Sequence, residues 1–209
     1  MRKLSLLLIA IIAITNSYSQ EVYFLTGSNF TKYNFSSGQG SIATSLESGT
    51  GTTYEMGYTR PLKNNRFSHT FGVNLNEFNV VAGSLANSYT WNTKYLGINN
   101  SLDFTVPLSK NFKLFLKAGL NLSTIIYGKQ SINGAIYDLK SQDEYSGLSF
   151  IPFTGVHLKY KINDFGYLSF GYGVSKSVIL FNISQEKLTT STNQILFGIH
   201  FNIKNTNKK

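Results

Sequence analysis

The feature of this sequence that most constrains its fold is an alternation of apolar and polar residues with a period of two. At 114–122, leucines and an alanine occupy every second position, and Lys117, Gly119 and Asn121 stand between them. Successive side chains of a β-strand point to opposite faces, so this pattern predicts a strand with one apolar face. No stretch after residue 19 has a sustained helical period. Comparable segments complete a set of eight, near 22–33, 52–62, 67–75, 96–106, 148–162, 168–174 and 195–203.

The connections between these segments alternate between short and long. Three are tight, at 60–67, 106–113 and 160–167. Strands joined by tight turns pair as antiparallel hairpins, so the tight turns gather at one end and the long connections at the other. Closure of the sheet removes its exposed edges. We therefore predict an all-β fold, an eight-stranded antiparallel up-and-down transmembrane β-barrel. The four long connections are rich in Ser, Thr, Gly and Asn and lie at about 34–51, 79–90, 127–147 and 178–191.

The first nineteen residues read as an export signal rather than as part of the fold. Arg2 and Lys3 precede a short apolar run over 4–14, and the small residues Ser17 and Ser19 follow it. This order is typical of a secretory signal peptide that is cleaved. We therefore predict a signal peptide at 1–19, a barrel domain at 20–203 and a basic C-terminal tail at 204–209, and an outer-membrane location.

Alternation alone does not say which face of the barrel is wet. A soluble, periplasmic lipocalin-like barrel would bind a small apolar ligand inside its apolar face, whereas an outer-membrane barrel turns that face to lipid. Segments of about ten residues match the length that crosses a bilayer as a tilted strand. Charged residues near strand centres occupy the polar phase, and only His69 is in an apolar phase. These features favour lipid on the outside, as do aromatic residues near the tight turns: Tyr58, Phe67, Phe104, Phe112, Tyr160, Phe165, Tyr167 and Phe201.

The charged residues predict two groups. Lys and Arg number 19 against 10 Asp and Glu, a formal net charge of +9. Most of this excess lies at the tight turns, so we predict a periplasmic basic rim that faces lipid phosphates or other polyanions. The inward phase predicts a polar network in the lumen, formed by Glu55, Asp103, Lys117, His157 and His200. The predicted rim contains Arg60, Lys63, Arg66, Lys110, Lys113, Lys159 and Lys161.

Signals for catalysis are scarce. The chain has no cysteine, which excludes disulfides, Cys-ligated metal sites and thiol nucleophiles. No glycine-rich phosphate loop, nucleophile elbow or pair of metal ligands at helical spacing occurs in it. We therefore expect no catalytic residues, no cofactor, no metal and no enzymatic activity, with a lipid-modifying enzyme as the alternative. An exported barrel meets no nucleic acid, so we expect none as a partner despite the basic charge.

Two of the long connections carry apolar residues. The segment 127–147 contains Ile132, Ile136, Tyr137, Leu139 and Tyr145, and the segment 178–191 begins with the run VILF. Exposed apolar residues in loops mark contact surfaces for a protein partner. We favour the other reading of these segments, in which the strands simply continue above the membrane as tall hairpins.

Four segments resemble a known family. They are similar to segments of the small outer-membrane β-barrel proteins of Bacteroidota, which are described as PorT-like or OmpX-like. The four segments are YLGINNSLDFTVPL (95–108), FKLFLKAGLNLS (112–123), IPFTGVHLKYKI (151–162) and NQILFGIHFNI (193–203). The resemblance implies an eight-stranded barrel in contact with outer-membrane lipid, without an assigned activity in most members. It also implies a link to protein export. The chain departs from the usual terminal aromatic residue, because KNTNKK follows Ile203. The expected function is a non-enzymatic membrane scaffold or surface-interaction module.

Overall fold

The computed structural model describes residues 20–36, 46–63, 66–83, 88–142, 145, 147–179 and 187–203. The predicted signal peptide at 1–19 and the predicted tail at 204–209 lie outside these described residues.

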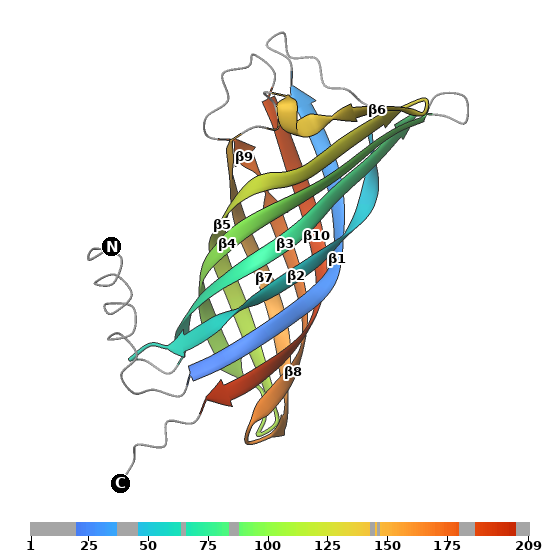
Figure 1. Cartoon of the computed structure of the whole chain (residues 1–209). Helices are drawn as coiled ribbons and strands as arrows, with labels where there is room; N and C mark the ends of the chain where they lie inside the picture. The colour runs from blue at the N-terminus through green and yellow to red at the C-terminus, as the bar shows by residue number, and fades with distance from the viewer. Residues whose placement is uncertain are drawn as a thin grey trace, which may run out of the picture.

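The described chain forms a closed antiparallel sheet (Figure 1). Each long strand pairs with its sequence neighbour, β5 pairs with β7, and β1 pairs with β10 to complete the ring. This confirms the predicted eight-stranded up-and-down barrel. The long strands are β1 (Gln20–Ser36), β2 (Leu46–Pro61), β3 (Phe67–Gly83), β4 (Ser88–Pro107), β5 (Phe112–Ile132), β7 (Leu148–Asn163), β8 (Gly166–Lys176) and β10 (Lys187–Ile203). Two short strands, β6 (Ala135–Asp138) and β9 (Val178–Ile179), and the 3-10 turn η1 (Leu139–Ser141) lie at the end opposite the tight turns.

The strand register sets the tilt of the barrel. A path along paired residues that leaves β1 at Glu21 returns to β1 at Thr31, ten residues further along the strand. With the usual rise and strand spacing, this stagger corresponds to a tilt of about 40°. A barrel of this size has an interior that is only wide enough for side chains. The path runs through Thr59, Thr70, Ser101, Gly119, Phe153, Ser175 and Thr192.

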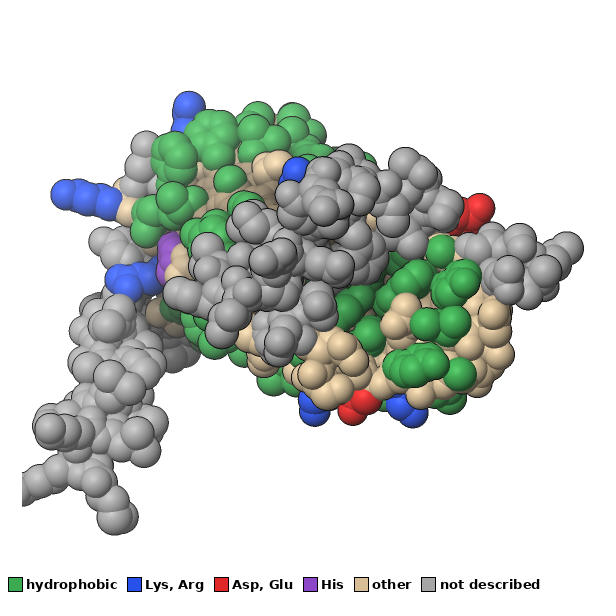
Figure 2. All heavy atoms as spheres, turned by 90° about the horizontal axis from the view of Figure 1, so that it is seen from above, with side chains coloured by type: hydrophobic (Ala, Val, Ile, Leu, Met, Phe, Trp, Pro, Cys, Tyr) green, Lys and Arg blue, Asp and Glu red, His purple; other side chains and the backbone are tan. Residues whose placement is uncertain are grey.

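The apolar phase of the strands faces outward. Large apolar side chains on the outer wall are well exposed, including Met56 at 62%, Leu102 at 54% and Phe197 at 57%. Figure 2 shows apolar side chains gathered on the walls that are visible from above. The inward phase of the same strands consists largely of buried Asn, Thr and Ser. A lipocalin-like barrel requires the opposite arrangement, so the described strands contradict that alternative.

Aromatic rings lie at the tight-turn end, as the sequence predicted. Phe67 contacts Phe104 across β3 and β4 with 5.1 Å between ring centroids, and Phe112 contacts Tyr160 at 5.0 Å. Offset or tilted ring pairs of this kind contribute beyond their buried area.

The strands extend further from the tight turns than the alternating segments alone predicted, as the tall-hairpin reading of 127–147 expected for β5. β3 continues to Gly83 and β4 begins at Ser88, so most of the predicted loop at 79–90 is a hairpin. β5 continues to Ile132 and turns through Asn133 and Gly134, which have φ values of 49° and 88°. A two-residue turn with positive φ at both positions matches the twist of the flanking strands. The apolar run VVA at 80–82 and the mixed segment SYTWNTK at 88–94 lack a clear period of two, so alternation did not reveal these strand ends.

An apolar cluster fills the barrel interior at this upper end. Leu139 of η1 and Tyr145 are only 2% and 6% exposed, because they pack into the cluster. The partner-surface reading of 127–147 requires both residues to be exposed, and their burial contradicts it at these two positions. The hydroxyl of Tyr33 donates to the carbonyl of Phe78 at 2.9 Å, so this buried hydroxyl has a hydrogen-bond partner inside the apolar cluster. Its members are Tyr33, Phe78, Val80, Ala82, Trp91, Tyr95, Ile125, Leu139, Tyr145 and Ile151.

Candidate functional site: the polar lumen

The centre of the lumen is built around Glu55 of β2. Its Oε1 accepts a hydrogen bond from the hydroxyl of Tyr23 at 2.6 Å and lies 3.4 Å from Nζ of Lys117. The amide of Asn99 donates to Oε2. The Lys117 ammonium also lies 5.5 Å from the ring centroid of Tyr23. These residues come from four different strands, so the contacts of this carboxylate link β2 with β1, β4 and β5 across the lumen.

Asp103 lies in the same region but has different partners. Its carboxylate accepts hydrogen bonds from the hydroxyls of Thr70 at 2.7 Å and Ser101 at 3.2 Å. Asp103 also faces Lys117 in the register of β4 and β5. Glu55, Asp103 and Lys117 of the predicted lumen network thus lie in one region, and hydroxyl groups are the hydrogen-bond partners of Asp103.

A second polar cluster lies nearer the tight turns. Oε1 of Glu21 accepts hydrogen bonds from Nζ of Lys159 and from Nδ1 of His200, the latter at 2.6 Å. Lys159 was predicted on the basic rim, but it is 5% exposed and lies inside the lumen, 4.3 Å from the ring centroid of Phe115. Sequence reasoning missed Glu21 and Tyr23, because both phases of the first strand carry apolar residues.

Glu21, His200 and Ser169 form a chain with the distances of a catalytic relay. Nε2 of His200 lies 2.8 Å from Oγ of Ser169. A nucleophile, a base and an orienting acid within hydrogen-bond reach are the general signature of an activated hydroxyl. However, Ser169 is 7% exposed, and the cavity that His200 lines has a volume of about 20 Å³. Pockets that hold small molecules usually measure about 300 Å³ or more. The geometry therefore satisfies buried polar groups without leaving room for an acyl substrate.

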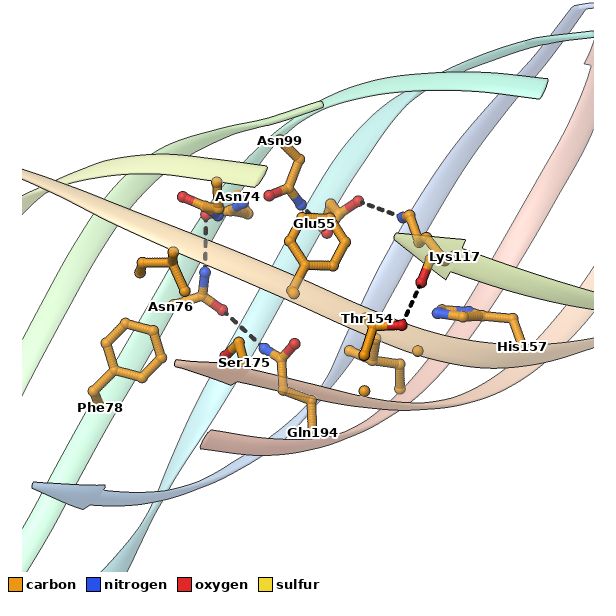
Figure 3. Close-up of a pocket in the computed structure, with 16 residues that line it drawn as sticks. Glu55, Asn74, Asn76, Phe78, Asn99, Lys117, Thr154, His157, Ser175 and Gln194 are labelled. Carbon is orange, nitrogen blue, oxygen red and sulfur yellow. Dashed lines mark hydrogen bonds and ion pairs between the residues drawn. The ribbon is translucent and has the colours of Figure 1, made fainter. Parts of the chain in front are cut away.

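Above Glu55, amide side chains surround a cavity of about 40 Å³, which Figure 3 shows in close-up. Gln194 donates to Asn29 at 2.7 Å, and Thr53 donates to Asn76 at 2.7 Å. Such a volume has room for about three water molecules. A Cβ on Gly97 would lie 2.4 Å from Oδ1 of Asn121, so a larger residue here would have to displace these amides. Four buried atoms here have no protein partner among the described residues: Asn74 Nδ2, Asn99 Oδ1, Asn121 Oδ1 and Ser123 Oγ.

His157 lies between the two clusters. It lines both the 20 Å³ and the 40 Å³ cavities, together with Lys117. Its ring packs over Gly171, where a Cβ would lie 2.6 Å from Nδ1. A third cavity of about 160 Å³ lies at the tight-turn mouth and shares Lys159 and Phe115 with the 20 Å³ cavity. The lumen is thus a narrow polar shaft below the apolar cluster.

The other predicted rim residues lie at the tight-turn end. Lys63, Arg66 and Lys110 are exposed, and Arg60 and Lys113 are half-buried. Nζ of Lys161 forms an ion pair with Asp164 at 2.7 Å. Nζ of Lys113 lies 5.2 Å from the ring centroid of Tyr167. Exposed pairs of this kind are screened by salt and contribute little to stability.

The described residues contain no group of three or more His, Asp or Glu side chains that could hold a metal ion. Within the same described part of the chain, no helix is long and apolar enough to cross a membrane.

Comparison with known proteins identifies the fold but no family. No protein-family model and no curated protein matches the sequence. The outer-membrane protein OprG from Pseudomonas aeruginosa is 10% identical with a TM-score of 0.52, over 90% of this chain and 97% of that chain. Neisserial surface protein A is 15% identical with a TM-score of 0.49, over 87% and 97%. The outer-membrane protease OmpT from Escherichia coli is 8% identical with a TM-score of 0.47, over 90% and 98%. The chain thus has the fold of outer-membrane β-barrels.

The buried pair of Lys117 and Glu55 yields a stability prediction. Lys117→Met leaves the Glu55 carboxylate buried without its cation, so we expect a loss of about 3–5 kcal/mol in the free energy of unfolding. Combining it with Glu55→Gln removes both charges and should recover most of that loss. Urea unfolding of the protein refolded in detergent or vesicles measures both values.

The exposed pair of Lys94 and Glu77 provides the matched control. Its atoms are closer, at 2.7 Å, but the Lys94 side chain is 44% exposed. Lys94→Met should therefore change stability much less than Lys117→Met, and any effect should fade with added salt. Equal losses for the two lysine variants would contradict a structural role for the lumen pair.

Proposed function

We propose that this chain is a small outer-membrane β-barrel protein that serves as a non-enzymatic membrane scaffold or surface-interaction module. The observation that carries this proposal is that the barrel is apolar outside and polar inside, the reverse of a soluble barrel. Large apolar side chains cover the outer wall, and hydrogen-bonded polar groups fill the lumen. Water would penalise such an outer wall, whereas a bilayer core requires it.

The height of the apolar wall supports a membrane location. On β4, the outward residues from Phe104 to Leu96 are apolar apart from Asn100, and Lys94 follows. These nine residues match the length of a tilted strand that crosses the hydrocarbon core. Lys94 pairs with Glu77 of β3, so charged side chains begin at the same level on both strands. The Glu77–Lys94 pair thus marks the upper border of the wall.

The lumen supports a scaffold rather than a pore or an enzyme. Its two cavities next to the charged clusters measure about 20 Å³ and 40 Å³, and a third of about 160 Å³ lies at the tight-turn mouth. A solute the size of a sugar or peptide has no space in such a shaft. His200 and Ser169 are buried in this shaft, away from the outer wall where lipid would lie, and Glu21 lines the mouth cavity.

The two ends of the barrel suggest its orientation and contacts. The basic rim at the tight turns fits the periplasmic side, where it would face lipid phosphates. At the other end, Ile136 and Tyr137 of β6 are 67% and 49% exposed, and they are the candidates for a protein contact. The second candidate segment, 178–191, is described only at 178–179 and 187–191. A PorT-like role in protein export is the more specific form of this proposal, and it rests on the sequence resemblance alone.

Membrane fractionation tests the location. We expect the full-length protein in the outer-membrane fraction, with a folded band on unheated gels that migrates differently after boiling, because small barrels resist detergent until they are heated. Mass spectrometry of the separated fractions identifies the chain. Recovery in the soluble periplasm without a heat-dependent shift would refute the proposal.

Two valines of β3 provide a sharper test of the bilayer. Val73 and Val81 are 43% and 44% exposed on the outer wall, but only Val73 lies below the border at Glu77. Val73→Arg should destabilise the folded protein in vesicles by about 2–4 kcal/mol, whereas Val81→Arg should have little effect. The measurement is urea unfolding in lipid vesicles. Equal effects at the two sites would argue against a membrane-embedded wall.

Purified protein should show no deacylation or palmitoylation of lipid A, because Ser169 is enclosed. Mass spectrometry of lipid A after incubation gives the readout, with Ser169→Ala as the control variant. Turnover by the wild-type protein that disappears in Ser169→Ala would replace the scaffold proposal with an enzyme.

A further inference from the structure

Two polar side chains lie on the outer wall within the belt of apolar residues. Nε2 of His69 on β3 donates to Oδ1 of Asn100 on β4 at 3.0 Å, and this hydrogen bond is exposed. Both residues are in the outward phase of their strands. This pair takes no part in the lumen contacts described above, and the proposed scaffold function does not require it.

Asn100 occupies the middle of the apolar belt. Along β4, it is the central one of five outward positions, with Leu102 and Ile98 on either side. Across the sheet, it pairs with Phe71 of β3 and Leu120 of β5, which also point outward. The outward neighbours of the amide are therefore apolar on all four sides, and His69 reaches it diagonally.

An amide at this depth has hydrogen-bonding capacity that lipid does not meet. Acyl chains neither donate nor accept hydrogen bonds, so an unsatisfied N–H group in the hydrocarbon region costs several kcal/mol. His69 supplies a donor to the amide oxygen, whereas the Nδ2 group of Asn100 needs an acceptor. Polar side chains within membranes commonly hold transmembrane segments together for this reason.

We propose that the β3–β4 wall is a contact surface for a second copy of this chain, with Asn100 at its centre. The inference rests on the proposed membrane location. An amide is self-complementary, because it carries both donor and acceptor groups. Around a two-fold axis, the same residue of each copy meets the other. Two Asn100 side chains then exchange reciprocal hydrogen bonds, and the surrounding Phe71, Ile98, Leu102 and Leu120 pack against their counterparts.

The absence of cysteine from the sequence permits a direct test. Asn100→Cys places a single thiol at the proposed axis, and oxidation of native membranes should give a covalent dimer of this chain. Phe197→Cys provides the matched control, because Phe197 is 57% exposed on β10, four strands away around the ring. Oxidation should link this variant at least tenfold less. Mass spectrometry identifies the cross-linked partner.

A second variant keeps the test independent of the cysteine. Asn100→Leu suits the lipid-facing wall, so it should retain the heat-modifiable folded band while dimerisation in vesicles weakens about tenfold, or about 1.4 kcal/mol. Energy transfer between labelled copies measures this change. Equal cross-linking at positions 100 and 197, unchanged association of Asn100→Leu, or an adduct with a different protein would each overturn the inference. Absence of the wild-type protein from the membrane fraction would instead refute the proposed function.

Discussion

Pairing of the first strand with the last is the interaction on which the rest of this structure depends. The ladder between β1 and β10 runs from Gln20 opposite Ile203 to Ser36 opposite Lys187. It closes the sheet with a fixed stagger, and the stagger and strand number together determine the width of the lumen. Closure also brings Glu21 and His200 into hydrogen-bond contact although 179 residues separate them in the chain. Contacts between strands that are not neighbours, such as that of Lys117 on β5 with Glu55 on β2, depend on this closure.

The narrow lumen explains why polar chemistry here is structural. In a wide barrel, Glu55, Asp103 and Lys117 would be hydrated and independent. Here they are packed among Tyr23, hydroxyl groups and amides, so each buried charge obtains its partners from the protein. The same enclosure gives Ser169 and His200 the distances of a relay while leaving little space beside them. Distances alone therefore do not identify an active site, because a substrate must also reach the nucleophile.

The outer wall has the opposite character to the lumen, because apolar side chains cover it. Its large apolar side chains are exposed, and a lipid environment explains their exposure. Polar residues are expected in the lumen, whereas a polar residue on the apolar wall needs a specific explanation. The one hydrogen bond between Asn100 and His69 is exposed on this wall and leaves the amide with a further donor group. The wall thus combines a general contact with lipid and one place suited to a specific contact.

The sequence by itself determined the strands, the tight turns and the phase of each charged residue, because the period of two is a local property of the chain. It placed Glu55, Asp103, Lys117, His157 and His200 on one face, and the structure finds them in the lumen. Only the tertiary structure decided what these residues contact. Glu21 and Tyr23 were missed because both phases of the first strand carry apolar residues. The contact of Lys159 on β7 with Glu21 on β1 depends on closure and stagger, which no local pattern encodes, so Lys159 was assigned to the rim. The same reason applies at the upper end, where Leu139 and Tyr145 resemble exposed loop residues in sequence but fold back into the interior of the closed barrel.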